Sequence, residues 1–113
     1  MKIINNCLTK VDPSDIVNGT FVIPPDVHTI VTYAFSSCGD ALTHIEIPDT
    51  ILHIGSNAFA NCTSLKKLKI PESVTVIGQQ AFACCSKDLT IVCKSGTVAE
   101  SVALGYEFKV ELE

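Results

Sequence analysis

One motif occurs three times in this chain of 113 residues, and it constrains the fold more than any other feature. Each copy begins with an isoleucine–proline pair and ends with an alanine–phenylalanine pair followed by a cysteine. The copies span 23–38, 47–62 and 70–85, so the isoleucine–proline pairs lie 24 and 23 residues apart. A repeat this short cannot bury its own apolar face, whereas stacked copies build one continuous core. The sequence therefore predicts a solenoid, in which equivalent residues of successive repeats form columns.

The alignment predicts which side chains form these columns. Before each isoleucine–proline pair, apolar and polar residues alternate, as in 45–47 and 68–70, which is typical of a half-buried strand. The proline then ends the strand because it has no N–H to donate. The predicted columns are Leu42 and Leu65; Phe21, Ile45, Leu68 and Ile91; Ile23, Ile47, Ile70 and Cys93; Val27, Ile51 and Val74; Ile30, Ile54 and Ile77; Ala34, Ala58 and Ala81; and Phe35, Phe59 and Phe82.

Two further features of the repeat suggest how the chain turns between strands. Gly55 and Gly78 follow the isoleucine of the Val/Ile-x-x-Ile-Gly segment, and we expect them to occupy an unusual backbone angle there. The segment Ala-Phe-x-x-Cys is expected to form a short helical turn with the phenylalanine pointing inward.

The whole pattern, L-x-x-L-x-I-P-x-x-V-x-x-I-G-x-x-A-F-x-x-C over roughly residues 20–93, resembles the BspA-like class of leucine-rich repeat proteins. The chain departs from it at Val31, which replaces the turn glycine in the first repeat, and after Cys93, where the last repeat stops. The resemblance implies an α/β solenoid, a short right-handed leucine-rich repeat stack of about three and a half repeats with terminal caps. It also implies an interaction or adhesion protein without enzyme activity in the repeat.

The two ends are expected to cover the open faces of the stack. We predict a single leucine-rich repeat domain over 1–113, with an N-terminal cap at 1–19, repeats at 20–93 and a helix-strand cap at 94–113. Thr97 and Glu100 have capping-box spacing, Gly105 is placed to end the helix, and residues 106–112 alternate like an edge strand. Near the start, Asp12 and Pro13 are suited to open a helical turn, and residues 3–4 to form a short strand.

The composition argues against several function classes. Twelve acidic and eight basic residues give a net charge of −4, and no basic stripe for nucleic acid is present. No apolar run approaches the ~20 residues needed to insert across a membrane. The sequence has no G-x-S-x-G, phosphate-binding glycine loop or H-E-x-x-H, so we predict no enzyme activity and no cofactor. No early apolar stretch resembles a secretory leader, which favours the cytoplasm, whereas the family resemblance allows a surface or secreted protein.

The six cysteines allow more than one interpretation. Cys38, Cys62 and Cys85 fall in one column, which suggests either a ladder of buried thiols or a disulfide or metal site. We favour the buried ladder, because parallel side chains are poorly placed for a bridge and no paired C-x-x-C spacing for a metal is present. Cys84 and Cys7 are the candidates for reactive thiols.

The outward side of the strands is the candidate binding surface. Its predicted columns are Thr20, His44, Lys67 and Thr90, and Val22, Glu46, Lys69 and Val92, with a basic end that includes Lys66. We predict a protein–protein interaction module that contacts a protein of unknown identity through His44, Glu46, Lys67 and Lys69. The alternatives are a plain solvated face, a surface adhesin or antigen of the BspA-like type that binds host matrix or cells, and weak self-association through the terminal strands.

Overall fold

A computed structural model describes all 113 residues. Its elements in chain order are β1 (Lys2–Ile4), β2 (Cys7–Lys10), the 3₁₀ helix η1 (Pro13–Asp15), β3 (Thr20–Val22), β4 (Thr29–Ile30), β5 (His44–Glu46), β6 (His53–Ile54), β7 (Lys67–Lys69), β8 (Val76–Ile77), β9 (Thr90–Cys93), α1 (Val98–Tyr106) and β10 (Lys109–Leu112).

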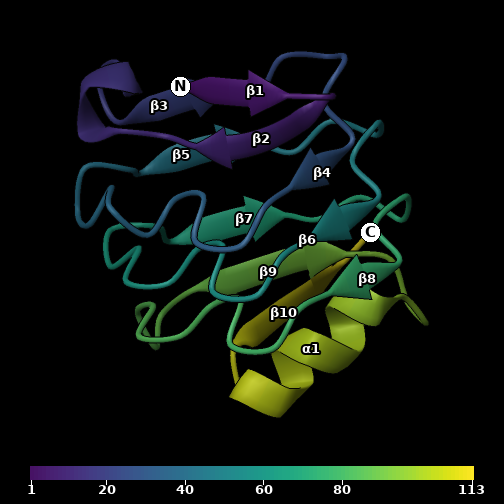
Figure 1. Ribbon diagram of the computed structural model, residues 1–113. Helices are drawn as coiled ribbons and strands as arrows, with labels where there is room; N and C mark the ends of the chain where they lie inside the picture. Colours follow the sequence, from purple (N-terminus) through teal and green to yellow (C-terminus); the bar gives the residue numbers. More distant parts are fainter.

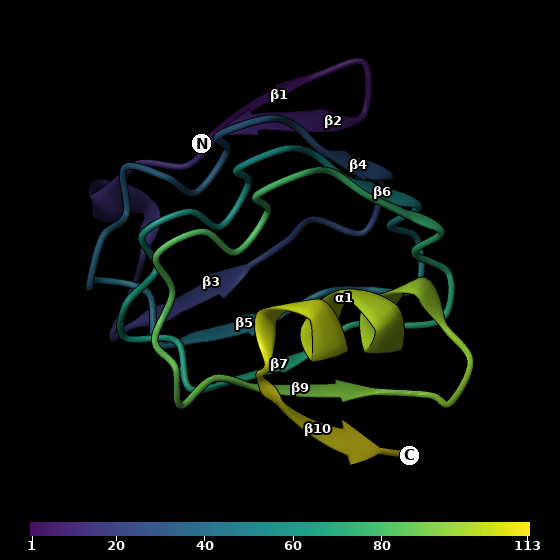
Figure 2. The ribbon, with the colours of Figure 1, turned by 90° about the horizontal axis from the view of Figure 1, so that it is seen from below.

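The strands lie on two opposite sides of the molecule (Figures 1 and 2). On one side, β3 pairs with β5, and β7 pairs with β9 and β9 with β10, all in parallel. β5 lies beside β7 without a ladder between them. On the other side, β2, β4, β6 and β8 pair in parallel, and β1 is added antiparallel to β2. Each repeat thus supplies one strand to each side.

The strand registers follow the sequence repeat. Thr20 pairs with His44 across β3 and β5, 24 residues apart, and His53 pairs with Val76 across β6 and β8, 23 residues apart. The predicted repeat is therefore the structural unit. The second set of strands was not predicted, because β4, β6 and β8 are only two residues long and leave no period-two pattern.

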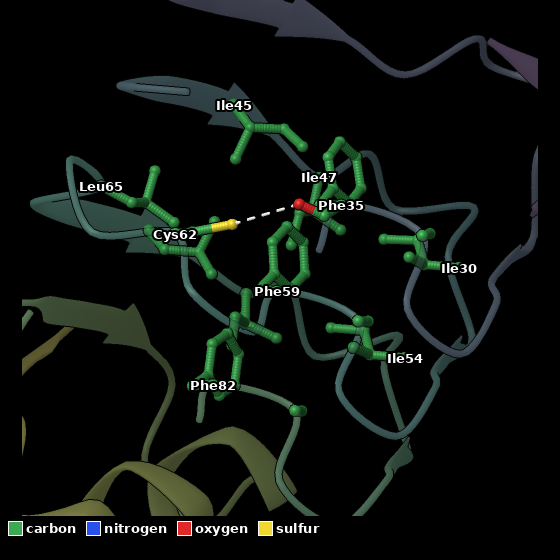
Figure 3. Packing of buried hydrophobic residues seen from close by; sticks show 14 of the residues in the cluster. Ile30, Phe35, Ile45, Ile47, Ile54, Phe59, Cys62, Leu65 and Phe82 are labelled. Atoms are coloured by element: carbon green, nitrogen blue, oxygen red, sulfur yellow. Dashed lines mark hydrogen bonds between the residues drawn. The ribbon is translucent and has the colours of Figure 1, made fainter. Parts of the chain in front are cut away.

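The predicted columns form the core between the two sides. Every residue assigned to a column is buried, except Ile77, which is half-buried and packs against the core near the end of the sheet. Figure 3 shows Ile45 and Leu65 on the left and Ile30 and Ile54 on the right, with the phenylalanine rings between them. Burial of these columns is the main term that stabilises the fold.

The phenylalanine column forms a stack along the core (Figure 3). The rings of Phe35 and Phe59 lie 4.8 Å apart and within 7° of parallel, and those of Phe59 and Phe82 lie 5.6 Å apart and within 8°. Phe21 meets Phe35 edge-on at 5.5 Å and ends the stack on the N-terminal side. Each ring therefore packs on the ring of the next repeat.

Tyr106 and Phe108 end the same stack on the C-terminal side. Both rings meet Phe82 edge-on, at 6.0 and 6.3 Å. In the first two repeats, the N–H of the column phenylalanine donates to the carbonyl of the alanine in the following repeat, at 2.8 Å in each case. Phe82 has no following repeat, and its N–H donates instead to the hydroxyl oxygen of Tyr106 at 3.2 Å. The tyrosine hydroxyl thus replaces the missing carbonyl.

Replacing Tyr106 with phenylalanine is expected to lower the free energy of unfolding by about 1 kcal/mol, because the partly buried N–H of Phe82 then loses its acceptor. Urea unfolding followed by circular dichroism measures the change. Tyr33→Phe is the matched control, since this side chain is 58% exposed and should tolerate the loss of its hydroxyl. Equal stability of Tyr106→Phe and wild type would contradict the assigned role.

The predicted reason for Gly55 and Gly78, an unusual backbone angle, was wrong. Neither Gly55 nor Gly78 has a positive φ. Glycine is required because the chain of the preceding repeat passes close by: a Cβ at Gly55 would lie 2.6 Å from the nitrogen of Thr32, and one at Gly78 would lie 2.4 Å from that of Ser56. The left-handed conformations fall two residues later, at Tyr33, Asn57 and Gln80. The segment that follows forms consecutive turns rather than a helical turn.

The ends of the chain agree in part with the predictions. Strand β1 includes residues 3–4, and η1 begins at Pro13 with Asp12 as N-cap, as expected. Thr97 is the N-cap of α1, but the helix continues through Gly105 and ends at Tyr106, with Glu107 in the left-handed conformation at φ 63°. Packing of Tyr106 against Phe82 outweighs the local preference of glycine for a helix end.

Candidate functional site

The candidate site is the strand face, defined here as the outward surface of β3, β5, β7, β9 and β10. Inward and outward residues alternate along β5 and β7, with Ile45 and Leu68 buried and their neighbours exposed. The predicted contact residues all lie outward: His44 and Glu46 on β5, and Lys67 and Lys69 on β7. Because β5 and β7 are neighbours, the fold brings these four side chains to one surface.

The two lysines are engaged by the C-terminal segment. The Nζ of Lys67 lies 3.4 Å from a carboxylate oxygen of Glu111, and that of Lys69 lies 3.0 Å from one of Glu113. The hydrogen bond and the negative charge of Glu113 raise the pKa of Lys69 above its ordinary value. The basic end at these lysines was predicted from the sequence, whereas the two carboxylates beside them were not. The alternation of residues 106–112 predicted an edge strand, and the pairing of β10 with β9 brings Glu111 of this strand near Lys67.

The burial of Val92 also shows that the C-terminal segment covers part of the strand face. It belongs to an outward row on β9, yet it is only 7% exposed. Val92 pairs with Lys69 on one side and with Glu111 on the other, so it lies between the two strands whose side chains form the ion pairs. The C-terminal end of the strand face is therefore covered by its own charged side chains, and the freely exposed part lies over β3 and β5.

His44 is held in a defined orientation. Its Nδ1 lies 3.0 Å from the hydroxyl oxygen of Thr43, and that hydroxyl also lies 3.1 Å from the carbonyl oxygen of Gly19. A hydroxyl has one proton to donate, and a carbonyl can only accept. The Thr43 hydroxyl thus links the imidazole ring of His44 to the backbone of Gly19.

Two adjoining hollows lie on and beside the strand face. One, of about 410 Å³, is lined by Val22, Ile23, Glu46, Ile47, Pro48, Asp49 and Lys69. The other, of about 470 Å³, is lined by Asp49, Lys69, Pro71, Glu72, Ser73, Lys94 and Glu113. They share Asp49 and Lys69, and the first is lined by three aliphatic side chains whereas the second has none. A binding surface over β5 and β7 thus has hollows as well as charged side chains.

Cys38 and Cys62 are buried in the core as predicted, whereas Cys85 is only half-buried and packs against the core. The thiols of Cys38, Cys62 and Cys85 each donate to a backbone carbonyl that lies 26 or 27 residues earlier in the chain. The sulfur–oxygen distances are 3.5, 3.7 and 3.1 Å. Figure 3 shows this contact for Cys62 and the carbonyl of Phe35. Burial raises the pKa of Cys62 to about 12 and those of Cys38 and Cys85 to about 11. Nowhere do three His, Cys, Asp or Glu side chains gather as metal ligands.

Alkylation with iodoacetamide at pH 8 is expected to label Cys84 first and Cys7 second, and to leave the other four thiols largely unmodified. Cys84 is exposed and Cys7 half-buried, whereas a thiol with a pKa of about 11 has about a thousandth of its population as thiolate at pH 8. Peptide mapping by mass spectrometry, with and without guanidinium, measures this order. Labelling of Cys62 as fast as Cys84 in the native protein would contradict it.

The family comparison agrees with the geometry. The family model described as BspA type Leucine rich repeat region (6 copies) matches residues 16–104, which is 89 of the 113 residues. No match was found among the curated proteins or among solved structures. None of the helices has the length and apolar character needed to cross a membrane.

Proposed function

Because the chain belongs to the BspA-type leucine-rich repeat family, we propose that it is a protein-binding module that contacts its partner through the strand face. The family comprises repeat proteins of interaction and adhesion and is generally non-enzymatic. The observation that carries the proposal is the placement of His44, Glu46, Lys67 and Lys69 as exposed neighbours on two strands. We further propose a right-handed solenoid in which residues 1–19 and 94–113 cap the repeats at 20–93.

The strand face is suited to recognition because its backbone is rigid. The side chains beneath it are buried to more than nine-tenths, among them Ile45 and Leu68 on β5 and β7. Outward side chains therefore project from a packed backbone, so a partner does not have to order the backbone beneath them. The contact between Nδ1 of His44 and the Thr43 hydroxyl also fixes the orientation of this imidazole ring on the surface.

The size of the face sets the expected affinity. The whole molecule measures 32 × 26 × 22 Å, and a stable complex buries about 800 Å² on each partner. Strands of three or four residues present less than this, so the partner must also contact the flanking turns. Binding in the micromolar range or weaker is therefore expected from this face alone.

Affinity capture with the full chain as bait tests the proposal. Lysine variants are poor probes, because Lys67→Glu or Lys69→Glu would place the new carboxylate beside Glu111 or Glu113. We therefore choose His44→Ala with Glu46→Lys on the strand face. The matched control is His53→Ala with Asp26→Lys, which makes the same chemical changes at exposed positions outside it.

A partner captured by wild type and by the control but lost by the strand-face variant would support the proposal. Circular dichroism must first show equal folding of all three proteins. Capture that is unchanged by the strand-face variant, or that is lost equally by the control, would place the contact elsewhere and overturn the proposal.

A further inference from the structure

The charges around the two hollows are unbalanced. The two lysines there, Lys69 and Lys94, are each held by a carboxylate, at 3.0 and 3.1 Å. The remaining charged side chains are Glu46 and Asp49, and neither forms an ion pair. Both are exposed and lie three positions apart, at the end of β5 and in the turn that follows it. The site therefore has two negative charges that no cation of the chain neutralises by direct contact.

An apolar wall lies beside these carboxylates. Val22 is 73% exposed on β3, where it pairs with Glu46, and it lines the same hollow as Ile47 and Pro48. An exposed valine next to a carboxylate suits a side chain that has an aliphatic stem and a positively charged head. Arginine and lysine have this construction, and the arginine guanidinium can also donate to two carboxylates at once.

We propose that this hollow binds an arginine side chain from an extended basic segment of the partner protein, with the guanidinium between Glu46 and Asp49 and the stem against Val22 and Pro48. The proposal rests on the proposed function and specifies the chemistry of the partner. An acidic segment fits poorly, because it would have to displace Glu113 from Lys69 while facing both unpaired carboxylates. The net charge of −4 favours the approach of a basic segment over the whole surface.

The probe for this proposal is an acetylated and amidated peptide, Gly-Arg-Val-Arg-Gly, titrated into the full ¹⁵N-labelled chain and followed by amide chemical shifts. Two further peptides replace arginine by citrulline, which is neutral and nearly isosteric, or by glutamate. We expect the arginine peptide to shift the amides of Val22, Glu46 and Asp49 and to bind in the millimolar range. Raising the NaCl concentration from 50 to 300 mM should lower the affinity for the arginine peptide about threefold, because its ion pairs with the carboxylates are exposed to solvent.

The variant Glu46→Gln with Asp49→Asn should weaken the arginine peptide about fivefold. Its matched control is Asp26→Asn with Glu107→Gln, which makes the same net change of charge at exposed positions outside the hollows and should alter the affinity by less than about twofold. The proposal would be overturned if the citrulline or glutamate peptide bound equally well, or if the control variant weakened binding as much. It would also be overturned if these amide shifts were absent at a peptide concentration about tenfold above the expected millimolar dissociation constant.

The two proposals fail in different ways. If the arginine peptide does not bind while a captured partner is still lost with His44→Ala and Glu46→Lys, the strand face remains the binding surface and only the basic chemistry is wrong. If the peptide binds as expected while no strand-face variant affects a captured partner, the hollow has its arginine preference and the protein contact lies elsewhere.

Discussion

Replacing Phe59 with alanine is expected to lower the free energy of unfolding by about 3–5 kcal/mol. Phe59 is fully buried and stacks between Phe35 and Phe82, so its removal opens a cavity in the middle of the aromatic column. The neighbouring rings cannot close this gap, because each is held in its own repeat. A loss of this size is a large part of the 5–15 kcal/mol that is typical for a domain. Urea unfolding measured by circular dichroism gives the change.

Two further variants keep this prediction testable if Phe59→Ala does not fold. Phe59→Leu retains most of the apolar volume and should lie between wild type and alanine. Leu104→Ala is the surface control, since Leu104 is 60% exposed, and it should change stability by less than about 0.5 kcal/mol. A loss below about 1.5 kcal/mol for Phe59→Ala would mean that the stack contributes little to the cohesion between repeats.

The columns could be predicted because the spacing of a sequence repeat shows which residues of successive copies are equivalent. Phe35, Phe59 and Phe82 occupy the same place in three copies, so their stacking follows once the copies are assumed to lie on one another. No long-range information is needed for this step. The same reasoning placed His44 beside Glu46 and Lys67 beside Lys69 on the outward side of two neighbouring strands.

The features that were missed lie where the repeat ends. Glu111 and Glu113 follow the last copy, and only the tertiary pairing of β10 with β9 brings them to the lysines of β7. Tyr106 is likewise outside the repeat, and its hydroxyl becomes an acceptor for Phe82 only through packing. Local sequence patterns cannot show such contacts, because they depend on where the chain returns after the repeats are complete.

The role of the repeat glycines leads to the second large prediction: Gly78→Ala is expected to lower the free energy of unfolding by about 2–3 kcal/mol. The added Cβ would lie 2.4 Å from the nitrogen of Ser56 and 2.8 Å from the carbonyl carbon of Gly55. Both are backbone atoms, so rotation of a side chain cannot relieve the clash. The two turns must separate, which lengthens the bond of 2.8 Å between the N–H of Gly78 and the carbonyl of Ile54.

Gly105→Ala makes the same substitution where the surroundings are open. Gly105 lies within α1, and a Cβ added there would meet no atom of a neighbouring segment within 4 Å. Alanine there should raise stability by about 0.5–1 kcal/mol, because it has less backbone freedom to lose in a helix. Opposite signs for the two variants, measured by urea unfolding under one set of conditions, would identify close approach of successive repeats as the reason for glycine in this motif. A neutral or stabilising Gly78→Ala would show that the repeats can separate by the required distance without loss of packing.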